Sequence, residues 1–243
     1  MRTLTSIAAA LAVAAILAPG PVSADLQQIV ATRDATIFEE NIVGANGKGH
    51  LFAGNNADGD ARRALLIFDV SGIPSGSVVD SAYVTLECTK GLSGTHPFSL
   101  HRMTKSWTEG PSTGTGRGGG IPSALTWLDV TWYYASFTAA ANDTFLTQGG
   151  DFIGAASATT AVGPDGSYGW SDSQLIADVQ AWVASPASNY GWILVGDEIN
   201  TANARRFDSR EDTILPTLTV IFSPPTPVEA ATWGKVKALY QPE

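Results

Sequence analysis

Short runs of alternating apolar and polar residues recur along the chain, and clusters of Gly, Pro, Asn, Asp and Ser separate them. A period of two places the apolar side chains on one face of a β-strand. Strands are predicted at 34–38, 50–53, 64–68, 81–89, 98–103, 128–132, 167–170, 192–195, 205–208 and 217–222. This succession of short strands and turns predicts an all-β fold, an antiparallel sandwich.

The segment SDSQLIADVQAWVAS, residues 171–185, has a different period. Leu175, Val179 and Trp182 recur at i, i+4 and i+7, which is the spacing of one helix face. Ser171 followed by Gln174 fits a capping box, and Pro186 ends the pattern. We expect one short helix over about 171–185, packed over an end of the sandwich.

The N-terminal segment is predicted to be a signal peptide at 1–24. Arg2 precedes an apolar run at 7–18, and small residues at Val22 and Ala24 favour cleavage after Ala24. The alternative is an N-terminal membrane anchor, although no later stretch approaches the ~18–20 apolar residues of a membrane-spanning helix. A secreted or extracellular protein without membrane insertion is therefore expected, either free or attached to the cell surface.

The rest of the chain is predicted to form a β-sandwich domain at 25–223, a proline-rich linker at 224–230 and a C-terminal tail at 231–243. The sequence has 14 basic and 23 acidic residues, a net charge of −9, which disfavours nucleic acid and anionic lipid as partners. An acidic polysaccharide could bind only at a local basic patch. Cys88 is the only cysteine, so no internal disulfide forms, and its strand parity predicts a buried side chain.

Seven motifs follow one another in a family-like order. They are DATIFEE (34–40), RRALLIFDVSGIPSGSVVDSAYVTLEC (62–88), WTEG (107–110), GGDF (149–152), YGWSDSQLIADVQAWV (168–183), NYGWILVG (189–196) and FDSREDTILPTLTVIF (207–222). Over roughly residues 28–223 the chain resembles the DNRLRE domain. That family comprises secreted bacterial β-sandwich modules related to carbohydrate-binding modules of the alginate-binding type. The resemblance implies a jelly-roll sandwich with no catalytic role, often appended to polysaccharide-degrading enzymes or surface proteins.

Charge is concentrated directly before the last predicted strand, at 205–212. The resemblance places the family's Ser-Arg-Glu motif on Ser209, Arg210 and Glu211. An arginine fork can satisfy backbone carbonyls and pair with a carboxylate at once. Arg210 and Glu211 are therefore predicted to form a structural ion pair that braces the fold.

Two pairs of neighbouring residues are candidates for ligand contacts. Arg205 and Arg206 lie on one predicted strand, so alternation turns one of them outward, and the same rule applies to Tyr133 and Tyr134. A sugar ring stacks on an exposed aromatic face, and neighbouring polar groups orient it. The predicted ligand-binding set is Trp132, Tyr133, Tyr134, Arg205 and Arg206, with core packing as the alternative for Trp132.

The segment NNADGD at 55–60 crowds oxygen-bearing side chains around a glycine. Asn55, Asp58 and Asp60 could hold calcium, the one cofactor that the sequence suggests. The alternative is an ordinary hairpin turn, because Asn, Asp and Gly all favour turns.

These features predict a noncatalytic module that binds polysaccharide or associates with an extracellular matrix. The rival is a structural cell-surface, adhesive or filament subunit that associates with its own copies. A third class is a polysaccharide lyase or hydrolase. The sequence holds no HExxH motif, which favours the noncatalytic reading.

Overall fold

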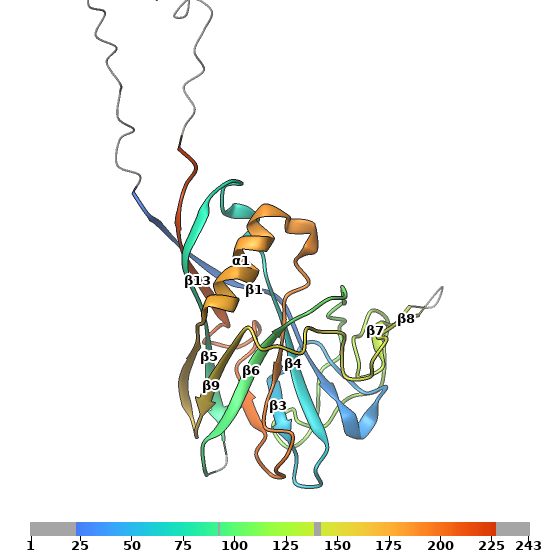
Figure 1. Ribbon diagram of the computed structural model, residues 1–243. Helices are drawn as coiled ribbons and strands as arrows, with labels where there is room; N and C mark the ends of the chain where they lie inside the picture. The colour runs from blue at the N-terminus through green and yellow to red at the C-terminus, as the bar shows by residue number, and fades with distance from the viewer. Residues whose placement is uncertain (1–22, 92, 139–141, 227–243) are drawn as a thin grey trace, which may run out of the picture. The chain divides into compact units, whose positions relative to one another are not determined.

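Two antiparallel β-sheets pack face to face in the computed structural model, which describes residues 23–91, 93–138 and 142–226 (Figure 1). Residues Ala24–Pro225 form one unit. The predicted signal peptide and C-terminal tail fall almost wholly outside the described residues, as does most of the linker. The strands are β1 (Asp25–Phe38), β2 (Ala45–Asn46), β3 (Leu51–Asn55), β4 (Ala61–Phe68), β5 (Val78–Lys90), β6 (His96–Arg102), β7 (Tyr134–Ser136), β8 (Asp143–Thr144), β9 (Ala158–Val162), β10 (Gly166–Trp170), β11 (Trp192–Val195), β12 (Arg205–Phe207) and β13 (Thr217–Ser223).

The pairing order confirms the predicted all-β sandwich. One sheet runs β1-β13-β5-β10, and the other runs β4-β11-β6-β9. Counted along the chain, these are strands 1-8-3-6 and 2-7-4-5 of an eight-stranded jelly roll. Strand β1 serves both sheets, because its first half pairs with β13 and its second half with β4. Strand β12 pairs with β5 and β3, and β3 also pairs with β4.

The core between the sheets follows from alternation along the strands. In β5 the inward positions Val84, Leu86 and Cys88 are buried, while Tyr83 faces solvent. Cys88 is a free, buried thiol, as its parity predicts, and burial raises its pKa. The protein is thus held together by apolar packing in the part of the chain that the structure describes.

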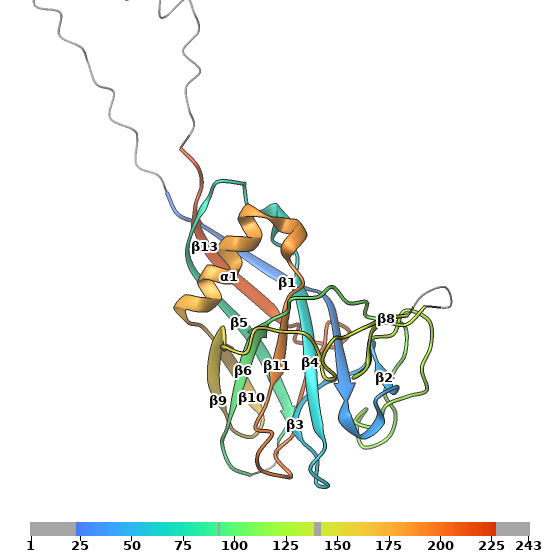
Figure 2. The same cartoon turned by 45° about the vertical axis from the view of Figure 1, so that its right-hand side comes forward.

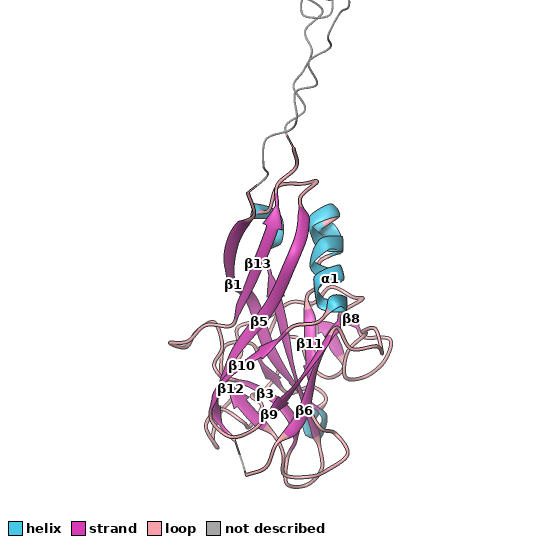
Figure 3. Ribbon diagram, turned by 60° about the vertical axis from the view of Figure 1, so that its left-hand side comes forward, coloured by secondary structure: helices cyan, strands magenta, loops and turns pink. Residues whose placement is uncertain are grey.

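Helix α1 (Ser173–Ala184) confirms the predicted helix and packs against the inner face of β5 (Figures 2 and 3). Its buried face includes Leu175, Val179 and Trp182, which join the same core cluster as the strands. The cap differs from the prediction. The Asp172 carboxylate accepts a hydrogen bond from the amide of Gln174, while the Ser171 hydroxyl donates to a carbonyl of β5. Aspartate caps a helix N-terminus well, because its charge also meets the positive end of the helix dipole.

The strand predicted at 128–132 is wrong. Leu128 has a positive φ of 69°, and the buried carboxylate of Asp129 accepts hydrogen bonds from the amides of Ser112 and Thr126. A carboxylate that binds backbone amides competes with strand pairing and fixes a turn. The apolar residues of this segment therefore alternate because a loop, and not a strand, directs their side chains into the core.

Candidate functional site

A basic pocket lies beside β3, β4 and β12. Its volume is about 180 Å³, and it is lined by Phe52, Arg62, Lys90, Gly91, Arg117, Ala204 and Arg206. Four of the seven lining residues are cations, contributed by β4, the end of β5, a glycine-rich loop at 114–120 and β12. None of the lining residues is a carboxylate or a histidine. The pocket therefore offers groups that bind anions.

Arg206 is held at the pocket by its neighbours. Its Nε donates to the Thr89 hydroxyl at 3.1 Å, and its Nη2 lies 3.4 Å from the Thr89 carbonyl oxygen. The glycine-rich loop closes over the guanidinium group, since a Cβ built on Gly118 would lie only 2.7 Å from Arg206 Nη1. Gly118 also has a φ of +74°, which favours glycine. Glycine at this position allows the loop backbone to approach the cation.

Arg62 forms the inner wall of the pocket. Its guanidinium carbon lies 5.5 Å from the centre of the Phe38 ring and 5.8 Å from that of Phe52. Its Nη2 donates to Glu40 at 2.6 Å. Its Nε is buried and has no hydrogen-bond partner among the residues described. A buried donor without an acceptor is unfavourable by about 1–3 kcal/mol, so a ligand oxygen here would stabilise it.

The side chains of Lys90 and Arg117 are exposed and carry no hydrogen bond or ion pair to any described residue. The carboxylates beside the lining residues include Glu40, which pairs with Arg62, and Asp165, which accepts from the amide of Gly91. Glu39 accepts from the amide of Ala61, next to Arg62. The lining itself holds four cations and no carboxylate, on a protein whose net charge is −9. The pocket is therefore a local basic patch, which an acidic protein needs in order to bind an anionic ligand.

Of the two predicted arginines, only Arg206 lines the pocket. Arg205 is fully buried, and its guanidinium group donates to the carbonyl oxygens of Gly163, Asn203 and Gly94. The prediction that one of the pair turns outward is thus confirmed. The prediction of Arg205 as a ligand contact is wrong, because β12 is an inner strand and its inward positions enter the core.

Arg210 braces the fold mainly through a partner that the sequence did not suggest. Its Nε and Nη2 donate to the two oxygens of Glu109 at 2.5 and 2.8 Å, while its contact with Glu211 is 3.1 Å long. Lys48 also donates to Glu109. Burial raises the pKa of Glu109, but the bonds from Arg210 and Lys48 outweigh it and lower that pKa below its ordinary value. The predicted pair of Arg210 and Glu211 is therefore one edge of a larger ion-pair network.

The aromatic candidates lie apart from the pocket lining. Trp132 is buried, with Arg63 at 4.6 Å from its ring centre, which contradicts a role as an exposed stacking face. Tyr133 is 36% exposed and Tyr134 is half-buried, and their ring centres are 4.9 Å apart. Strand alternation does not separate them, because the Thr131 hydroxyl accepts from both of their amides and forms a turn.

The residues proposed for calcium form the hairpin turn between β3 and β4. The Asn56 side-chain oxygen accepts from the amides of Asp58 and Asp60, and the Asn56 amide group donates to the Asp60 carboxylate. The Asn55 side-chain oxygen is buried without a hydrogen-bond partner among described atoms. Asn56 thus organises this turn through the amides of Asp58 and Asp60 and through the Asp60 carboxylate.

Sequence reasoning missed three of the four cations of the pocket. One signal was available for Arg62, since the pair Arg62–Arg63 on a strand must split between two faces, as Arg205–Arg206 does. Arg63 faces the other side and pairs with Glu198 at 2.7 Å. Lys90 and Arg117 carried no such signal, because they lie at a strand end and in a loop.

The sequence matches no model of a known protein family and no curated protein. The described ranges also contain no helix that is long and apolar enough to cross a bilayer. The pocket and its charges therefore carry the functional argument.

Proposed function

We propose that this protein is a secreted, noncatalytic module that binds an acidic polysaccharide through the basic pocket. The observation that carries the proposal is the group of four cations, Arg62, Lys90, Arg117 and Arg206, around an apolar floor at Phe52. The DNRLRE resemblance supports a carbohydrate ligand, and the charge of the pocket favours a chain that bears uronate or sulfate groups.

The size of the pocket indicates how such a chain would bind. Pockets for drug-sized ligands measure about 300–1,000 Å³, whereas this pocket measures about 180 Å³. It suits one charged sugar unit, with the rest of the chain lying across the surface. Arginine forks pair with carboxylate and sulfate oxygens through two hydrogen bonds at once, which gives orientation as well as attraction.

The lining also supports a binding role over a catalytic one. Lyases and hydrolases need a positioned acid or base, and glycosidases need two carboxylates across the bond that is cleaved. No carboxylate, histidine or tyrosine lines this pocket. The pocket accordingly offers attraction and orientation, and the proposal assigns it no reaction.

Affinity electrophoresis of the full chain in gels that contain alginate, pectate, xylan or chitin tests the proposal. We expect retardation by an acidic polymer and not by chitin. An affinity in the micromolar range, about −8 kcal/mol, is expected from a few exposed contacts. Arg206→Ala, Lys90→Ala and Arg117→Ala should each weaken binding, by about tenfold for a charge-assisted bond of roughly 1.5 kcal/mol.

Lys105→Ala is the matched control, because Lys105 is a surface cation that pairs with Asp143 at 2.7 Å and does not line the pocket. Tyr133→Ala tests the aromatic alternative in the same gels. Retardation lost in Tyr133→Ala but kept in Arg206→Ala would move the site to the aromatic residues. No retardation by any polymer, together with self-association of the protein, would favour the structural subunit.

A further inference from the structure

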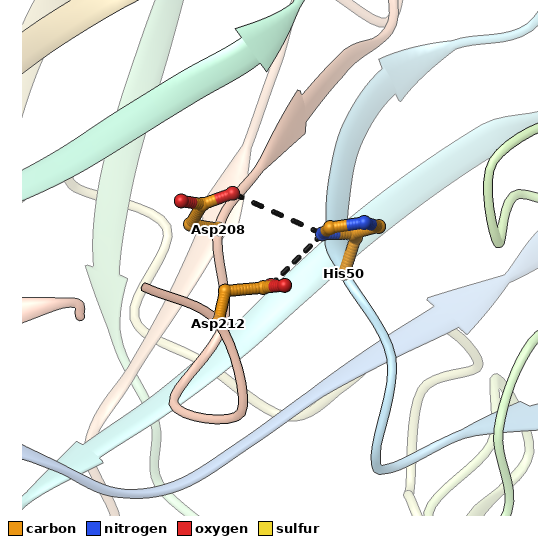
Figure 4. A group of neighbouring side chains, drawn as sticks. All are labelled: His50, Asp208 and Asp212. Atoms are coloured by element: carbon orange, nitrogen blue, oxygen red, sulfur yellow. Dashed lines mark ion pairs between the residues drawn. The ribbon is translucent and has the colours of Figure 1, made fainter. Parts of the chain in front are cut away.

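His50, Asp208 and Asp212 come together from two distant parts of the chain (Figure 4). His50 directly precedes β3, and Asp208 directly follows β12. Because Phe207 pairs with Leu51 in the antiparallel register, Asp208 and His50 are the next cross-strand neighbours. Asp212 lies in the turn after β12, and the dashed lines in Figure 4 join one carboxylate oxygen of Asp212 and one of Asp208 to the same ring nitrogen of His50. One donor atom from each residue lies within 4.8 Å of the other two.

Asp208 has a buried carboxylate without a hydrogen-bond partner. Its side chain is only 10% exposed, and the nearest basic nitrogen is His50 Nδ1, at 3.9 Å. Its carboxylate accepts no hydrogen bond from the described residues, although its own amide donates to the Glu87 carbonyl. A buried carboxylate is strongly unfavourable unless it is paired or binds a metal ion. Because the Asp208 side chain is nine-tenths buried, a positive partner in the space that its carboxylate faces would stabilise it.

The contact between His50 and Asp212 has the spacing of a hydrogen bond without its direction. His50 Nδ1 lies 2.8 Å from Asp212 Oδ2, yet this buried nitrogen makes no directional hydrogen bond to the described residues. Asp212 Oδ2 instead accepts from the amide and the hydroxyl of Ser209. A nitrogen and an oxygen that lie close together but do not point at each other are arranged like two ligands of a common ion.

We infer that His50, Asp208 and Asp212 form a site for one divalent transition-metal ion of the Zn²⁺ class. Tetrahedral donors at about 2.0–2.2 Å from Zn²⁺ lie about 3.3–3.6 Å apart. The separations from His50 Nδ1, 2.8 and 3.9 Å, lie on either side of this spacing. All three donors lie within 4.8 Å of one another, so a small rotation of one carboxylate completes the set.

The donor types favour a transition metal over calcium. Imidazole nitrogen suits Zn²⁺, Ni²⁺ and Cu²⁺, whereas Ca²⁺ takes six to eight oxygen ligands. Three protein donors leave further positions on the ion for water or another ligand. The ion would tie the turn at 209–212 to the start of β3, so its binding stabilises the folded state.

Calorimetric titration with Zn²⁺ and thermal melting with and without Zn²⁺ test this inference. The full chain is used without a histidine tag, after a chelator has removed bound metal. We expect one Zn²⁺ per chain and a higher melting temperature with the ion. Asp208→Asn should weaken Zn²⁺ binding by about tenfold or more. Since the Asp208 carboxylate accepts no hydrogen bond among the described residues, this change leaves the other contacts of the turn in place. His50→Gln is a second, independent variant.

His96→Gln is the matched control. His96 Nδ1 lies 2.9 Å from Asp197 Oδ2, but the Asp197 carboxylate also accepts from Asn200 and from the amide of Ile199. This variant should bind Zn²⁺ like the wild type. Absence of Zn²⁺ binding, or binding that neither Asp208→Asn nor His50→Gln weakens, would overturn the site. Ca²⁺ binding as tight as that of Zn²⁺, and equally reduced in Asp208→Asn, would overturn the class of metal.

Discussion

Replacing Asp34 by asparagine should make the protein more stable at neutral and alkaline pH. Asp34 is fully buried on β1, beside Glu109 and Arg210. Burial is the main cause that raises its pKa, from 3.8 to about 8, and the negative charges of Glu211 and Glu109 raise it further. The backbone amide of Arg210 donates to one oxygen of Asp34 and opposes the shift, while the other oxygen has no partner among the atoms described.

The sign and the size of the effect follow from this raised pKa. A carboxyl group that binds its proton more tightly in the folded state favours folding at low pH, and this contribution is lost as the pH rises through the folded pKa. Between pH 3.8 and about 8 the pKa difference is about 4, and each pKa unit corresponds to about 1.4 kcal/mol. Asp34 therefore removes up to about 6 kcal/mol of stability across this interval, with a slope of up to about 1.4 kcal/mol per pH unit.

Urea unfolding of wild type and Asp34→Asn at several pH values between 4 and 9 measures this effect. Asparagine keeps an acceptor for the Arg210 amide and carries no charge. The difference in unfolding free energy should be small near pH 4 and grow in favour of the variant towards pH 8. Asp69→Asn is a control of opposite sign, because bonds from Ser71 lower the pKa of Asp69. A difference that stays constant with pH, or that favours the wild type at pH 8, would show that Asp34 is ionised and stabilising.

Four further substitutions separate the structural arginines from the pocket arginine. Arg210→Ala should lower the unfolding free energy by roughly 1–3 kcal/mol, less than the 3–5 kcal/mol of a fully buried pair, because Arg210 is 29% exposed. Lys105→Ala, at a surface pair, should change the unfolding free energy by less than about 1 kcal/mol. Equal losses in Arg210→Ala and Lys105→Ala would show that the ion pairs of Arg210 do not brace the fold. Arg205→Met should lower stability by at least about 3 kcal/mol, because it leaves several buried carbonyl oxygens without donors. Arg206→Ala should melt near the wild type. A larger loss of stability in Arg206→Ala than in Arg205→Met would contradict the finding that Arg205 is the buried member of the pair.

The fold was predictable because local patterns decide it. The alternation around Cys88 and the helical spacing of Leu175, Val179 and Trp182 both report which face is buried, and tertiary packing agrees with them. The prediction at 128–132 failed because Asp129 binds backbone amides, and a side-chain bond of this kind leaves no mark on the period of the sequence.

The candidate sites were less predictable, because they depend on strand register. Alternation showed that Arg205 and Arg206 face opposite ways but not which of them faces the core. Glu109 meets Arg210 across 101 positions of sequence. His50 meets Asp208 only because β3 pairs with β12. The period of a single sequence does not reveal these pairings, so the pocket and the proposed metal site became visible only in the structure.

Calorimetric titration of a short uronate oligosaccharide into the wild type and into Arg206→Ala tests the central claim most directly. The account predicts binding in the micromolar range to the wild type, weakened by added salt because the pocket attracts charge. It also predicts at least about tenfold weaker binding to Arg206→Ala at an unchanged melting temperature. Equal binding to both proteins, or no binding of the acidic oligosaccharide to the wild type, would contradict the account.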